Sequence, residues 1–129
     1  MKQLLPDGWP RPSGYSNGIL ADGKQVYVAG MIGWNESGDF ADGFVEQLAQ
    51  TLHNTVAVLA AADAGPENIV RMTWYVKDLD AYRNNLANIG KTYREIMGKN
   101  FPAMAVVGVT GLVEPNALLE IESTAVIPC

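Results

Sequence analysis

The spacing of apolar residues changes along this chain, and that change most limits the fold it can adopt. From Phe44 to Ala62 apolar residues recur every three or four positions, which predicts a helix. From Ile69 to Lys77 they alternate, which predicts a strand with one buried face. Residues 82–97 return to helical spacing, whereas residues 103–110 and 117–127 again predict strands. This order indicates an α+β fold in which helices cover a sheet.

Turn residues suggest where these elements begin and end. Asp22-Gly23 supplies the positive backbone angles of a tight turn, so a hairpin is expected between residues 19–20 and 26–29. In the first seventeen residues, the prolines and glycines indicate loop or extended chain. Four residues are expected to mark the helix ends: Asp42 and Asp80 as caps, Gly65 and Gly98 as stops.

The predicted sheet has more apolar surface than its helices can bury. Two helices suffice to cover one face of one mixed sheet, but the strands also carry Val, Trp and Tyr on the other face. An oligomer that packs sheet against sheet is the simplest way to bury that second face.

Length and composition exclude several classes of protein. The 129 residues form a single domain, 1–129, that can bury a complete core without disulfides or a structural metal. One cysteine and one histidine exclude a disulfide framework and disfavour a zinc site. The net charge of −5 makes nucleic acid a poor partner. No apolar run suggests a signal peptide or a membrane span, so a cytoplasmic location without membrane contact is expected.

Two glutamates on the last strand are the first candidates for chemistry. Glu120 and Glu122 share one face, and their neighbours include Leu118, Leu119 and Ile121. Desolvation raises the pKa of a carboxylate in apolar surroundings, which suits a group that orients or deprotonates water. The alternation also fits an ordinary edge strand whose polar side is solvated. The spacing alone leaves both interpretations open.

Other candidates give weaker signals. Arg11 lies on a proline-stiffened loop and could bind a small anion, although it could equally be solvated. The two glycines of residues 30–35 could leave backbone N–H groups open to a ligand, but the pattern is not a phosphate loop. His53 lies on the polar face of its helix and is expected at the surface. Cys129, as the last residue, is expected to be an exposed thiol.

An ordered set of segments spans nearly the whole chain. They are Gly14–Gly18, Val26–Ile32, Leu52–Ala61, Val70–Asp78, Phe101–Ala103 and Leu119–Glu122. Taken together, they resemble the reactive intermediate deaminase (Rid) family of small imine and enamine deaminases. The resemblance implies a chorismate-mutase-like fold and a homotrimer whose sheets form a central barrel. Three clefts would then lie between the subunits.

The resemblance also implies a site and a reaction. The substrate is an unstable imine or enamine that binds through its carboxylate, and water attacks the C=N carbon, which releases ammonia and leaves a keto acid, without metal or organic cofactor. Tyr15 in the entry loop and the backbone around Gly30 and Met31 would bind the substrate. Glu120 would position the attacking water.

Two departures from the family pattern affect substrate binding. The family's deaminases have an arginine directly after Pro-Ala, where it binds the substrate carboxylate, and this chain has Met104. Methionine offers an apolar surface and no hydrogen-bond donor. The family asparagine that faces the cleft aligns near Gly90, so it has no counterpart here.

Three functions follow from this pattern. The first is a deaminase with altered substrate choice, in which Arg11 or a basic group of the neighbouring subunit binds the carboxylate. A longer dicarboxylate resembling 2-aminomuconate is one such substrate. The second is a non-catalytic trimer that binds a small metabolite. The third is a ribonuclease, which the negative charge and the lack of a basic stripe disfavour.

Overall fold

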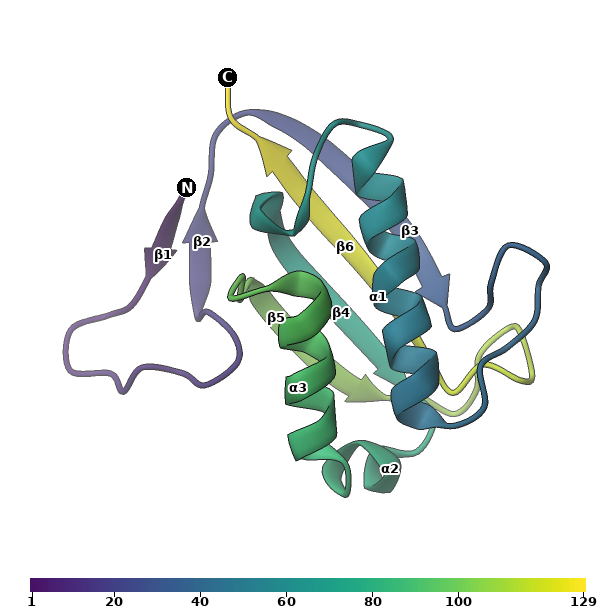
Figure 1. Ribbon diagram of the computed structural model, residues 1–129. Helices are drawn as coiled ribbons and strands as arrows, with labels where there is room; N and C mark the ends of the chain where they lie inside the picture. The colour runs from purple at the N-terminus through teal and green to yellow at the C-terminus, as the bar shows by residue number, and fades with distance from the viewer.

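A four-stranded mixed sheet backed by helices forms the body of the protein (Figure 1). The computed structural model describes residues 1–129. Its helices are α1 (Phe44–Ala60), η1 (Pro66–Asn68), α2 (Leu79–Arg83) and α3 (Leu86–Met97). Its strands are β1 (Lys2–Leu4), β2 (Gly18–Leu20), β3 (Lys24–Ile32), β4 (Ile69–Val76), β5 (Ala103–Gly108) and β6 (Leu119–Ile127).

The strand order of the main sheet is β3-β6-β4-β5. β6 pairs antiparallel with both β3 and β4, whereas β4 and β5 run parallel. Parallel neighbours need a crossover connection, and α2 and α3 supply it here. The predicted α+β class with a mixed sheet is therefore confirmed.

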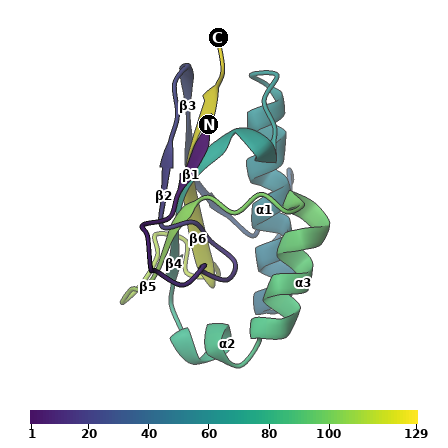
Figure 2. The same ribbon diagram turned by 90° about the vertical axis from the view of Figure 1, so that its left-hand side faces the viewer.

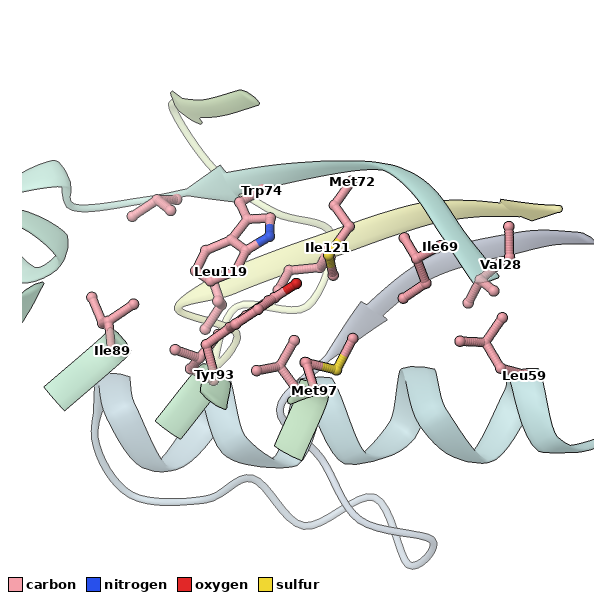
Figure 3. Close-up of a cluster of buried hydrophobic side chains, with 14 of the residues drawn as sticks. Val28, Leu59, Ile69, Met72, Trp74, Ile89, Tyr93, Met97, Leu119 and Ile121 are labelled. Atoms are coloured by element: carbon pink, nitrogen blue, oxygen red, sulfur yellow. The ribbon is translucent and has the colours of Figure 1, made fainter. Parts of the chain in front are cut away.

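Helices cover one face of the sheet only (Figure 2). β4 directs Met72, Trp74 and Val76 toward the helices, and β6 directs Leu119, Ile121 and Ala125 the same way. The leucines of α1 meet them, and several of these side chains are drawn in Figure 3. The predicted alternation of β4 and β6 is thus confirmed. The opposite face of the sheet has no helix against it (Figure 2).

The predicted hairpin between residues 19–20 and 26–29 is wrong. β2 pairs instead with β1, in a separate two-stranded sheet, so the chain has two sheets rather than one. Gly23 has a φ of +147°, and a β-carbon there would lie 2.0 Å from the carbonyl oxygen of Ile127. The Asp-Gly signal marks a change of direction at which β3 joins β6, not a return of the chain onto β2.

The predicted helix caps need correction. Gly43, not Asp42, precedes α1, and it provides no side-chain cap. Asp78, not Asp80, caps the second helix, because its Oδ1 accepts the backbone N–H of Asp80 at 2.9 Å.

The other predictions about the helices were partly correct. The expected second helix breaks at residues 84–85 into α2 and α3, so three α-helices replace the two predicted. α1 already ends at Ala60, before Gly65. Gly98, with a φ of +69°, follows α3 as predicted.

No helix of the chain is both long and apolar enough to span a bilayer.

Tyr93 on α3 makes the stability of the fold depend on pH in the alkaline range. Its hydroxyl donates to the carbonyl of Asn100, and burial raises the pKa of its phenol above the ordinary value. The folded state favours the neutral phenol, so Tyr93 contributes to the free energy of unfolding while the phenol is neutral. This contribution is complete below pH about 10 and is lost as the pH rises toward the folded-state pKa.

We expect Tyr93→Phe to lower the free energy of unfolding by about 1 kcal/mol at pH 8, because the Asn100 carbonyl loses its donor. The difference between variant and wild type should shrink above pH 10, since only the wild type has this phenol to ionise. Urea unfolding at both pH values measures it. A difference that is constant with pH would contradict the assignment.

Candidate functional site

Glu120 lies on the face of the sheet that no helix covers. On β6 it is opposite Ile32 of β3 and Tyr75 of β4. Its carboxylate rests against Gly30, where a β-carbon would lie 2.4 Å from Glu120 Oε2. While the carboxylate keeps this position, only glycine fits at residue 30. The structure therefore brings together Glu120 and Gly30, two residues that the sequence analysis placed in one site.

A bulge in β3 accompanies this contact. The register with β6 shifts between Val28 and Met31, so that Ala29 and Gly30 have no Cα partner. Bulges often occur beside active sites, where they redirect side chains and end regular pairing. Met31 itself is half-buried and packs against the core. Gly30 is exposed, so the backbone at the bulge is the part accessible to a ligand.

Glu122 has a different environment from Glu120. It is exposed, and its Oε1 accepts a 2.5 Å hydrogen bond from the hydroxyl of Tyr75. This hydrogen bond is the main cause that raises the pKa of the Tyr75 phenol, followed by desolvation and the negative charges of both glutamates. Arg71 opposes the shift. Glu122 is therefore already engaged by a partner within the chain, unlike Glu120.

Tyr15 and Met104 lie near each other at the opposite edge of the sheet, where β5 is the edge strand. They line a cavity of about 240 Å³ whose other residues are Ser16, Asn17, Arg71, Ala103 and Ala105. The entry loop is fixed to the start of β5, because the backbone N–H of Ser16 donates to Pro102 O at 3.0 Å. The Ser16 hydroxyl also donates to the carbonyl of Phe101. Tyr15 is thus held beside Met104 by backbone pairing.

Arg11 belongs to the same entry loop as Tyr15. It lines a neighbouring cavity of about 270 Å³ that includes Tyr15 but not Met104. The guanidinium group that shares a cavity with both Tyr15 and Met104 is that of Arg71. The sequence analysis missed Arg71 as a site residue. Its position on the outward side of the alternating β4 strand was the available signal.

The predicted site residues form two separate groups in one chain. Gly30, Met31 and Glu120 lie at the β3–β6 pairing, whereas Tyr15 and Met104 lie at β5. The strand order places these groups on opposite halves of the sheet. No cavity described in the chain contains members of both groups.

The side chains do not form a metal centre. No group of three or more His, Cys, Asp and Glu residues is close enough to hold a metal ion. His53 and Cys129 are both exposed, as their positions in the sequence predicted. The absence of a cofactor from the reaction stays a prediction.

Comparison with known proteins identifies the family. A family model described as Endoribonuclease L-PSP matches residues 10–127. A Rid-family protein of unknown function, YyfB from Yersinia pestis, has a crystal structure that superposes with a TM-score of 0.85 and 31% identity, covering 98% of each chain. The chain belongs to the Rid family. The resemblance noted in the sequence is therefore confirmed, and the Rid fold with it.

Two further relatives are similar to this Rid protein over nearly its whole length. It is 34% identical over 128 residues to a RutC family protein of Aquifex aeolicus, covering 98% of this chain and 99% of that one. It is 30% identical over 120 residues to a 2-iminobutanoate/2-iminopropanoate deaminase of Dermatophagoides farinae, covering 92% and 90%. Imine deamination is thus an activity named within the Rid family.

Proposed function

We propose that this Rid protein hydrolyses a reactive imine or enamine to a keto acid and ammonia, with a substrate choice set by Met104. The observation that carries the proposal is the placement of the Glu120 carboxylate against the exposed backbone of Gly30, at a bulge on the open face of the sheet. A relative named as an imine deaminase supports the reaction class.

The reaction needs only water and a positioned carboxylate. Glu120 orients a water molecule and accepts its proton as the oxygen attacks the C=N carbon. That proton then passes to nitrogen, which gives a carbinolamine. Its hydroxyl loses the second proton to nitrogen as the carbon–nitrogen bond breaks, so that ammonia leaves and the keto acid carbonyl forms. An enamine substrate first tautomerises to the imine. No oxidant or reductant is required, because hydrolysis of C=N changes no oxidation state. Glu122, hydrogen-bonded to Tyr75, takes no part in this scheme.

A homotrimer would bring the two groups of site residues together. The open face of the sheet carries large exposed side chains, including Tyr27, which is 72% exposed, and Val107. Packing this face against further copies would bury them and form clefts between subunits. The β3–β6 group of one subunit could then face Tyr15 and Met104 of the next. The arrangement follows the one implied for the family.

The substrate carboxylate must find a partner other than residue 104. Methionine has no donor, and a carboxylate bound without a charged partner loses roughly 2–5 kcal/mol. Arg71 shares a cavity with Met104, and Arg11 lines a neighbouring cavity beside the entry loop. Either could bind a carboxylate placed farther from the reacting carbon, as in a dicarboxylate resembling 2-aminomuconate.

The same substitution favours a second function. A cleft that has lost its carboxylate anchor could bind a small metabolite without turning it over. A panel of imines in a coupled ammonia-release assay separates the two functions. Binding without ammonia from any imine would establish the non-catalytic trimer. Ribonuclease activity, which the family description mentions, is disfavoured by the net charge of −5.

We expect the protein in solution to have a mass about three times its subunit mass of 13.9 kDa. Light scattering across a range of concentrations measures it. A monomer at every concentration would remove the intersubunit cleft and, with it, the proposed site.

Glu120→Ala should abolish ammonia release from a verified substrate and leave the trimer intact, because the water loses its base. Glu122→Ala is the matched control on the same strand face. It should keep most of the activity, since it loses only the Tyr75 hydrogen bond. Steady-state kinetics and light scattering give both readouts. Full activity of Glu120→Ala would contradict the assigned role.

Met104→Arg should raise activity on small imines, such as those that an amino-acid oxidase produces, because a guanidinium binds a short carboxylate in a bidentate manner. The variant should also lose about 1–3 kcal/mol of stability, since its charge would be partly buried near Arg71. A well-folded variant without any gain would favour the binding protein.

A further inference from the structure

An aromatic cavity lies on the helix side of Met104. Its volume is about 380 Å³, within the range of small-molecule sites. Its walls include Trp74, Tyr82, Tyr93, Phe101 and Met104. Trp74 contacts Tyr82 and Tyr93 with ring centroids 6.3 Å apart in each case, and Tyr93 stacks on Phe101 at 5.8 Å. Figure 3 shows Trp74 and Tyr93 between the sheet and α3. Such walls suit a flat or branched apolar group.

One cation borders this cavity. Arg94 lies four residues after Gly90 on α3, and both residues line the cavity. Side chains on a helix lean toward its N-terminus, so Arg94 extends over Gly90. A β-carbon on Gly90 would lie 3.1 Å from Arg94 Nη1. Glycine weakens a helix interior, and here it leaves the space that the guanidinium group occupies.

Arg94 has no carboxylate partner. The one ion pair in the structure joins Arg83 and Asp80, and no Asp or Glu lines the cavity. In addition, the buried indole N–H of Trp74 has no acceptor within the chain. Buried donors without a partner are uncommon in folded proteins. The cavity therefore combines apolar walls with one cation that has no carboxylate partner.

We propose that this cavity binds a carboxylate with an aromatic or branched apolar body, and that Arg94 binds its carboxylate. Arg94 would then supply from α3 the charge that Met104 does not supply from β5. The inference rests on the proposed function in one respect, namely that the bound acid is the imine substrate or its keto-acid product. It predicts a preference for large apolar imines over small ones.

Binding of phenylpyruvate, a keto acid with an aromatic body, tests the cavity directly. Calorimetry should show that Arg94→Gln weakens this affinity by about tenfold to a hundredfold, the effect of a lost charged hydrogen bond. Lys91→Gln is the matched control, because Lys91 is an exposed cation on α3 that does not line the cavity. It should bind as wild type does. Phenylacetone, which lacks the carboxylate, should not distinguish the three proteins.

Kinetics separate this inference from the proposed function. With the imine of phenylalanine, Arg94→Gln should raise KM more than it lowers kcat, and Arg94→Lys should restore part of the loss. Equal phenylpyruvate affinity in wild type and Arg94→Gln, or an equal loss in Lys91→Gln, would overturn the Arg94 site. If phenylpyruvate binding depends on Arg94 but no imine is hydrolysed, the deaminase proposal fails and the site stands. If imines are hydrolysed without dependence on Arg94, the site fails and the deaminase proposal stands.

Discussion

The register of β6 determines both the core and the candidate site. This strand pairs antiparallel with β3 on one side and β4 on the other, so its alternation sorts side chains for the whole sheet. Leu119 and Ile121 enter the core, while Glu120 and Glu122 face outward. A slip of one residue would bury two carboxylates under α1 and expose the core leucine and isoleucine. The burial that stabilises the fold therefore also fixes the direction of the candidate catalytic group.

Within that register, the fate of each carboxylate depends on its neighbours. Glu122 has a hydrogen-bond donor in Tyr75, which holds it in place within the chain. Glu120 has instead a glycine at a bulge, which gives it room but no side-chain partner. A carboxylate that no partner satisfies is free to act on water or substrate. The difference between two chemically identical residues comes from β3 and β4, not from β6.

Local sequence patterns predicted the parts of the fold that depend on local physics. The period of α1 and the alternation of β4 and β6 follow from one buried face each, and they were correct. The predicted partner of β2 was wrong, because a turn at Gly23 does not specify which strand pairs with which. Glu120 and Gly30 entered as candidates, Glu120 through its spacing and both through the resemblance, but their contact depends on a bulge that no local pattern marks. Arg71 and Arg94 look like ordinary solvated cations on a strand and a helix. Arg71 comes beside Met104 only through the pairing of β4 with β5, and Arg94 only through the position of α3 at the cavity that Met104 lines.

Met104 separates two cavities of different character. On the open face, Arg71 and Tyr15 make a small polar cavity, and on the helix face Arg94 borders a larger aromatic one. An arginine at position 104 would place one fixed charge at the boundary and so favour a short carboxylate. Methionine is flexible and uncharged, which leaves the carboxylate to bind a cation farther away on one side or the other. Under the proposed mechanism, the distance from that cation to the water that Glu120 would position sets the length and polarity of an acceptable substrate. Substrate choice in this protein would therefore be determined by the elements that flank β5 rather than by β5 itself.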